Sequence, residues 1–121
     1  MNKDNNLYNK AYAFAIRIVK AYQYLSTEKK EFVLSKQLLR CGTSIGANIA
    51  EANGSISKSD FSAKMSIAYK ECLEVKYWLS LLKDTGFIEE AWFESIFADS
   101  EELSKILFSI LKSTRIKKRN K

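Results

Sequence analysis

The chain contains no histidine and no proline, and only 4 glycines and 2 cysteines among its 121 residues. Without histidine it lacks the usual general base, the Ser-His and Cys-His nucleophile pairs, and the commonest ligand of zinc and di-iron sites. Proline interrupts helices, so its absence favours long helical segments. Cys41 and Cys72 each fall in an apolar stripe, which predicts reduced core residues rather than a disulfide or a reactive thiol. We therefore expect a helical protein that is not an enzyme and has no metal or other cofactor.

Long hydrophobic runs are absent as well. No apolar stretch approaches the 18 or more residues that a membrane-spanning helix needs. The first ten residues, MNKDNNLYNK, lack the hydrophobic region of a signal peptide. We expect no membrane segment and a cytoplasmic location.

Four segments carry apolar residues at helical spacing, and no segment shows strand-like alternation. They cover about residues 7–25, 32–52, 61–82 and 93–111. Short connections separate them, and a chain of this length forms one domain. These features predict an all-α fold, an antiparallel up-down-up-down four-helix bundle over residues 1–121, with a basic C-terminal tail at about 113–121.

Polar and glycine residues mark the predicted helix ends. Asp4 or Asn5 is a candidate N-cap of the first helix, and Ser57, Ser59 and Asp60 are capping candidates for the third. Gly54 and Gly86 follow the second and third helices, where glycine is common. These residues place the turns of the predicted bundle.

The first segment has a second apolar line beside its main stripe. This line contains Tyr8, Tyr12, Ala15, Val19 and Tyr22. A helix with one partner needs only one apolar stripe, so the wider face predicts association with further copies of the chain.

The net charge of +6 is unevenly distributed. Residues 1–60 carry a net charge of +4, residues 61–111 carry −4, and the last ten carry +6. Such asymmetry indicates an anionic partner, most simply nucleic acid, although basic tails also occur merely for solubility. The candidate nucleic-acid-binding residues are Lys10, Arg17 and Lys20 on the first helix and Lys112, Arg115, Lys117, Lys118, Arg119 and Lys121 in the tail. The tail is a run of like charges without apolar partners, so we expect it to be mobile. It has no interleaved aromatic residues, so we expect it to bind RNA through backbone charge without sequence specificity.

A polar stripe runs along the second helix, next to its apolar seam, and polar residues also interrupt the third. The two sets are Gln37, Arg40, Ser44, Asn48 and Glu51, and Lys70, Glu71 and Glu74. Buried polar groups require hydrogen-bond partners, so we predict a structural network between the two helices, or a subunit interface. The carboxylates could be mistaken for di-metal ligands, but the Glu-x-x-His pairs of such sites are missing.

Gly42 and Gly46 are spaced by four residues inside the second helix. Glycine in a helix interior costs about 1 kcal/mol relative to alanine. Close approach of another helix backbone would offset that cost, and a tolerated solvent-facing position is the alternative.

Two segments resemble the motifs of a known bacterial family. They are residues 34–52, which include Thr43-Ser44-Ile45-Gly46-Ala47-Asn48-Ile49-Ala50-Glu51, and residues 61–79, which include Lys70-Glu71, Glu74 and Tyr77-Trp78-Leu79. The family comprises the four-helix-bundle proteins encoded within intervening sequences of the large-subunit ribosomal RNA gene, some of them labelled ribosomal proteins. Many members have Glu-Gly where this chain has Glu51-Ala52.

The resemblance implies a closed ring of five identical subunits. It also implies kinship with the accessory protein of diversity-generating retroelements, a basic pentamer that binds a reverse transcriptase and nucleic acid. The family itself brings no settled activity. Two hypotheses follow: a non-catalytic RNA-binding oligomer, or a ring-shaped adaptor that docks another protein, such as a reverse transcriptase, without touching nucleic acid.

Overall fold

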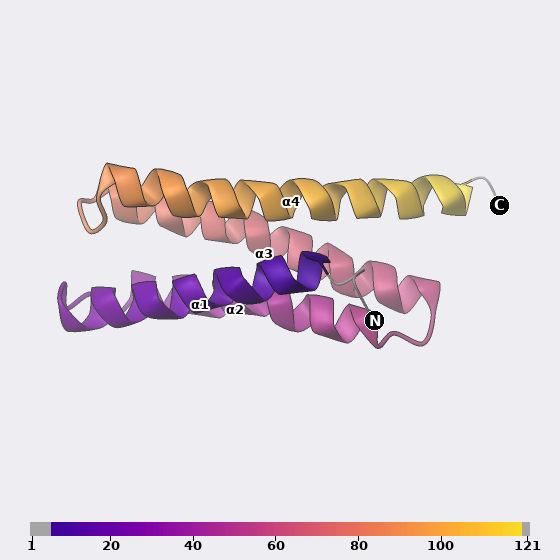
Figure 1. Cartoon of the computed structure of the whole chain (residues 1–121), viewed down its shortest axis with the longest axis horizontal. Coiled ribbons are helices and arrows are strands. Elements are labelled where there is room, and N and C mark those ends of the chain that lie inside the picture. Colours follow the sequence, from indigo (N-terminus) through magenta and orange to yellow (C-terminus); the bar gives the residue numbers. More distant parts are fainter. Residues whose placement is uncertain (1–5, 120–121) are drawn as a thin grey trace.

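In the computed structural model, the backbone of residues 6–119 and the side chains of residues 6–114 are described. This part of the chain forms the four helices α1 (Asn6–Thr27), α2 (Leu34–Asn53), α3 (Lys58–Asp84) and α4 (Glu90–Arg119) (Figure 1). Consecutive helices run in opposite directions, and short connections join them. The predicted all-α four-helix bundle is confirmed.

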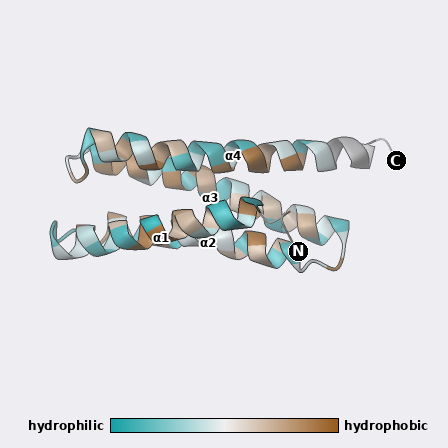
Figure 2. Cartoon of the chain, in the orientation of Figure 1, coloured by the Kyte–Doolittle hydropathy of each residue, from teal (hydrophilic) through white to brown (hydrophobic). Residues whose placement is uncertain are grey.

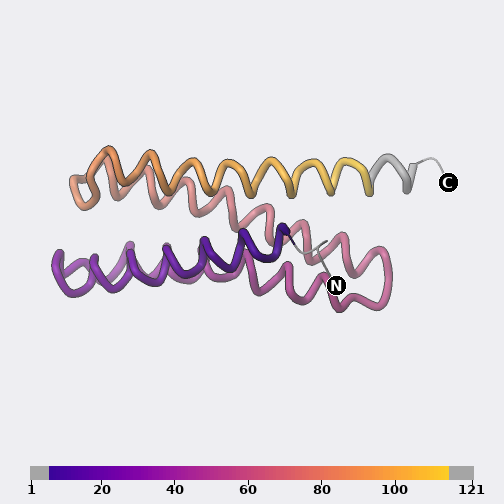
Figure 3. The backbone as a smooth tube through the Cα atoms, viewed as in Figure 1, coloured from indigo at the N-terminus to yellow at the C-terminus, as the bar shows by residue number. Residues whose placement is uncertain are grey.

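The four helices do not pack equally with one another. α1 and α2 lie side by side, and α3 crosses obliquely from the end of α2 toward the beginning of α4 (Figure 3). α4 packs mainly on α3 and contacts α1 over a short stretch, whereas within residues 6–119 it makes no backbone approach to α2. α3 therefore links the α1–α2 pair to α4.

The core consists of the apolar stripes that the sequence predicts. Hydrophilic and hydrophobic residues are interspersed along the helices (Figure 2). The largest fully buried side chains include Ile18, Leu38 and Leu79. Cys41 and Cys72 are free thiols with no exposed surface, and burial raises the pKa of each to about 12. Both thiols are thus protonated core groups, as the sequence indicates.

Gly42 and Gly46 lie where α1 and α2 approach each other. A Cβ atom on Gly42 would lie 2.7 Å from Cγ1 of Ile18, and one on Gly46 would lie 3.6 Å from the carbonyl oxygen of Ala11. Close helix packing is therefore confirmed over the solvent-facing alternative. The contact is much tighter at Gly42 than at Gly46.

Side chains and backbone turns define the helix ends. The Ser57 hydroxyl accepts a hydrogen bond from the Asp60 N–H at 3.0 Å, which confirms Ser57 as the N-cap of α3. After α3, Gly86 has a φ of +86°, and the Phe87 N–H donates to the Leu82 carbonyl. The candidate caps of α1, Asp4 and Asn5, lie outside the described residues.

α2 begins two residues later than predicted, and the residue that caps it was missed. The N–H groups of Val33, Leu34 and Ser35 donate to the Glu31 carboxylate at 2.7–3.1 Å. The Ser35 hydroxyl donates to the Glu31 carbonyl, so the two residues tie the connection to the helix. In the sequence Glu31 stands among other charged residues, and nothing in that pattern distinguishes it as a cap.

The basic segment predicted as a tail at about 113–121 is helical over its described part. α4 continues as helix through Arg119, six residues past the predicted start of the tail. No proline or glycine follows Gly86, and lysine and arginine are good helix formers that suit the negative end of the helix dipole. The basic segment is therefore an extension of α4 over the described residues.

Candidate polar network and nucleic-acid interface

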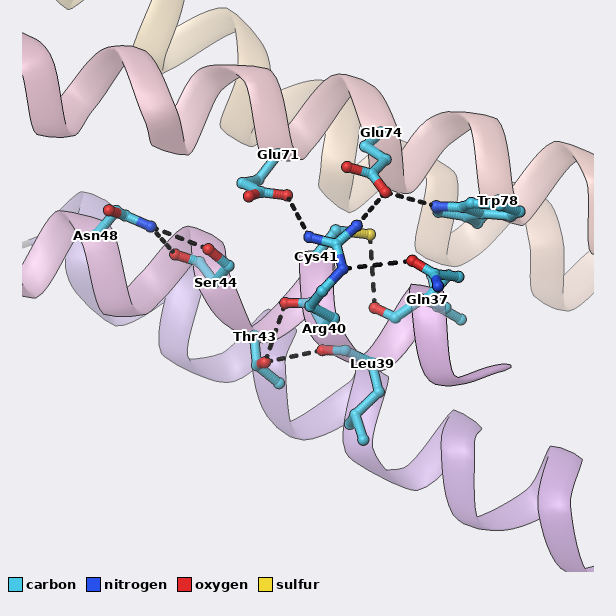
Figure 4. A network of polar contacts seen from close by, with 11 residues as sticks. Gln37, Leu39, Arg40, Cys41, Thr43, Ser44, Asn48, Glu71, Glu74 and Trp78 are labelled. Atoms are coloured by element: carbon cyan, nitrogen blue, oxygen red, sulfur yellow. Dashed lines mark hydrogen bonds and ion pairs between the residues drawn. The ribbon is translucent and has the colours of Figure 1, made fainter. Parts of the chain in front are cut away.

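Arg40 is the centre of a polar network between α2 and α3 (Figure 4). Its Nε donates to Gln37 Oε1 at 3.3 Å, and its Nη1 donates to Glu71 Oε1 at 3.4 Å. Its Nη2 forms an ion pair with Glu74, which also accepts a hydrogen bond from Trp78 Nε1 at 2.9 Å. One cation thus connects two carboxylates of α3 to α2.

Trp78 is a network member that the sequence analysis missed. It lies one helical turn after Glu74, and that spacing could have revealed it, because residues four apart meet on a helix surface. The indole N–H holds the Glu74 carboxylate toward Arg40.

Four other predicted members lie outside the Arg40 network. The Asn48 amide donates to the carbonyl and the hydroxyl of Ser44 within α2, both at 2.9 Å, and Glu51 forms an ion pair with Lys64 at 2.8 Å. Lys70 is exposed and has no hydrogen bond or ion pair to a described residue. The described contacts therefore do not join these residues to the Arg40 network, and the alternative of a subunit interface stays a prediction. Helical spacing cannot reveal which turn of α3 lies opposite each turn of α2.

The network lies at the boundary between core and solvent. The Arg40 side chain is 50% exposed and that of Glu71 is 18% exposed. At such positions ion pairs contribute little to stability, but their directional bonds fix how two helices align. We assign the network to the register of α2 against α3.

Two of the three candidate basic residues on α1 are already paired. Lys10 lies 3.0 Å from Glu102, and Arg17 lies 2.7 Å from Asp99 and donates to Ser95 at 3.2 Å. The acidic residues of α4 thus neutralise most of the basic line expected on α1. Lys20 is exposed and has no ion pair among the described residues.

A second group of candidate basic residues lies at the end of the chain. Lys112 is exposed, and the backbone of Arg115, Lys117, Lys118 and Arg119 is helical. The side chains of these four residues, and all of Lys121, lie outside the described part. The last ten residues carry six positive charges and no acidic residue in sequence.

Part of α1 exposes apolar side chains to solvent. Tyr12, Ile16 and Val19 are 58%, 45% and 37% exposed, whereas Tyr8 and Tyr22 of the second predicted line are half-buried. The second line therefore lies beyond the core of the single chain.

Among residues with described side chains, no three histidine, cysteine, aspartate or glutamate residues gather in a way that could hold a metal ion. None of the described helices combines the length and apolar character needed to cross a bilayer.

Comparison with known proteins identifies the family. The model of the family described as 23S rRNA-intervening sequence protein matches residues 3–109. A crystal structure of a protein of unknown function from the S23 ribosomal protein family of Bacteroides thetaiotaomicron is 52% identical, with a TM-score of 0.89. That likeness covers 92% of this chain and 99% of the other, and no curated protein matches. The chain belongs to the 23S rRNA-intervening sequence protein family.

Proposed function

We propose that this protein is a non-catalytic oligomer that binds RNA through the phosphate backbone. The observation that carries the proposal is the separation of charge along α4. The first half of α4 contributes Asp99 and Glu102 to ion pairs with α1, and the last ten residues of the chain, 112–121, add six cations without an acid. A dense cationic segment attracts a polyanion and releases its counterions.

The family supplies a second line of support. Its description refers to the intervening sequence of 23S rRNA, which makes RNA the favoured nucleic acid. RNA of this kind is cytoplasmic in bacteria, and we propose that the protein acts there.

The proposal includes self-association, with five subunits favoured. The exposed Tyr12, Ile16 and Val19 of α1 support it, since a second copy would cover them. The resemblance described above implies a ring of five. A ring repeats the cationic end of α4 in each subunit, and this repetition strengthens binding to a long strand.

RNA binding at two salt concentrations tests the function. We expect a single-stranded RNA oligomer to bind at 50 mM salt and to bind much more weakly at 200 mM. Deletion of residues 115–121 removes five positive charges per chain and should flatten the salt dependence by about 0.7 in logarithmic slope for each lost phosphate contact.

Two control variants accompany the deletion. Exchange of the five tail cations for glutamine keeps the helix length, and it should weaken binding as much as the deletion does. Lys64→Gln removes one cation that pairs with Glu51 and should leave binding unchanged. Absence of RNA binding by the full chain at low salt would contradict the proposal and would favour the adaptor that docks another protein.

A further inference from the structure

A pocket of about 350 Å³ lies between the C-terminal half of α1 and the start of α4. Leu25 and Ile88, both part of the hydrophobic core, form its apolar base. Its volume falls within the range of small-ligand sites. Of the residues that line it, Arg17 is paired with Asp99.

The pocket exists because α1 and α4 approach each other closely only over a short stretch. Long ion-paired side chains bridge α1 and α4: Lys10 reaches Glu102, and Arg17 reaches Asp99. The α1–α2 contact is closer, because α2 has glycine there. Toward the α3–α4 turn no such bridge follows, and the pocket opens there between the two helices.

Two aromatic residues line the pocket, and Trp92 also packs against the hydrophobic core. Tyr24 of α1 is 47% exposed, and Trp92 of α4 is half-buried. Neither ring pairs with another aromatic ring, and the indole N–H of Trp92 has no acceptor among the described residues. The other tryptophan, Trp78, has its N–H bonded to Glu74. Tyr24 and Trp92 thus present ring surface to a ligand.

Charged groups at the same pocket narrow the chemical class of the ligand. The ammonium group of Lys20 has no ion pair among the described residues, whereas Arg17 is held by Asp99. The carboxylate of Glu89 also lines the pocket and can accept hydrogen bonds from amino groups. A planar aromatic ring with one negative charge and amino groups at its edge fits this set, and a nucleotide has all three.

We propose that the pocket receives one unstacked base of a single-stranded RNA, with the base against Tyr24 and Trp92 and its phosphate at Lys20. This inference rests on the proposed RNA binding and adds a base contact to it. Stacking on aromatic side chains accepts any base, and Glu89 favours the bases that carry an amino group, adenine, guanine and cytosine. Bases in an RNA duplex are already stacked, so the site discriminates against duplex RNA.

The test compares two probes on three proteins. The probes are a labelled ten-nucleotide oligoadenylate and a strand of equal length with abasic positions. The proteins are the full chain, Tyr24→Leu, and the matched control Tyr77→Leu, which alters a tyrosine of similar exposure on α3. We expect the full chain and Tyr77→Leu to bind the base-containing strand about tenfold more tightly than the abasic strand. Tyr24→Leu removes one of the two stacking rings, so it should bind the base-containing strand severalfold more weakly and should keep the affinity of the full chain for the abasic one.

A second measurement reports on Trp92 directly. In a Trp78→Phe background Trp92 is the only indole, and oligoadenylate should quench its fluorescence while the abasic strand does not. Quenching by adenosine monophosphate but not by the oligomer would show that the pocket binds a free nucleotide, and it would overturn the proposal that it binds a base of an RNA strand.

The outcomes separate this inference from the proposed function. If the full chain bound both strands equally and with a strong salt dependence, the proposed base binding in the pocket would be overturned. The proposed binding to the phosphate backbone would still stand. An unchanged preference in Tyr24→Leu would overturn the base binding in the same way. Absence of binding to either strand would overturn both proposals.

Discussion

Gly42 and Gly46 show how differently two similar residues are constrained. The helical position of each is unremarkable in sequence, yet a methyl group on Gly42 would overlap the branched, fully buried Ile18. The methyl group on Gly46 would make ordinary van der Waals contact with Ala11. The sequence could predict that another helix approaches α2 closely at these glycines. Only the three-dimensional packing shows that the close α1–α2 contact depends on Gly42.

We predict that Gly42→Ala destabilises the protein by about 1–3 kcal/mol, because the core around Ile18 must shift. Gly46→Ala is the matched control. It should be neutral or stabilising by up to about 1 kcal/mol, since alanine favours helix. Urea unfolding followed by circular dichroism measures both. Equal effects of the two substitutions would contradict this account of the α1–α2 contact.

At the scale of the element, the start of α2 depends on Glu31. Burial alone would raise the pKa of this carboxyl group, but the hydrogen bonds from Leu34, Ser35 and Val33 outweigh that effect and hold the pKa below its ordinary value of 4.5. A carboxyl group with a lowered pKa in the folded state stabilises the fold above its unfolded pKa. That stabilisation is lost as the pH falls through the lower, folded pKa.

We predict that Glu31→Ala lowers the free energy of unfolding by about 1 kcal/mol at pH 7, the usual effect of losing a helix cap. The difference from the parent should shrink as the pH is lowered from 5 to 3. Glu28→Ala changes an exposed carboxylate in the same connection and should have little effect at either pH. Thermal unfolding across this pH range provides the measurement, and a difference independent of pH would exclude the carboxylate as the cap.

At the scale of the whole molecule, the exposed apolar face of α1 is the feature that a single chain leaves unexplained. Tyr12, Ile16 and Val19 lie there, whereas Arg17 of the same helix reaches α4. A second copy that packs on Tyr12, Ile16 and Val19 would cover this face.

We predict that light scattering returns a mass of roughly 70 kDa for a ring of five subunits of 13.9 kDa. Ile16→Glu should reduce that mass, because a charge in an apolar interface loses its hydration. Ile67→Glu, at a similarly exposed isoleucine of α3, is the control and should leave it unchanged. A parent chain that runs as a monomer at micromolar concentration would contradict the prediction.

The sequence by itself determined the helices, the core and the family. Apolar spacing identified Ile18, Cys41 and Leu79 as core residues, because an α-helix places every third or fourth residue on one face whatever its neighbours are. The motif around Ser44 and Glu71 indicated the family. Each of these properties is local to one segment.

Only the tertiary structure decided which side chains meet. It placed Arg40 opposite Glu71 and Glu74, joined Glu51 to Lys64, and paired Lys10 and Arg17 with acids of α4 that lie more than 80 residues away in sequence. It also brought Tyr24 and Trp92 to one pocket. Such contacts depend on the register and the crossing angle of the helices. Side-chain packing between helices sets both, and the residue pattern of a single helix does not contain them.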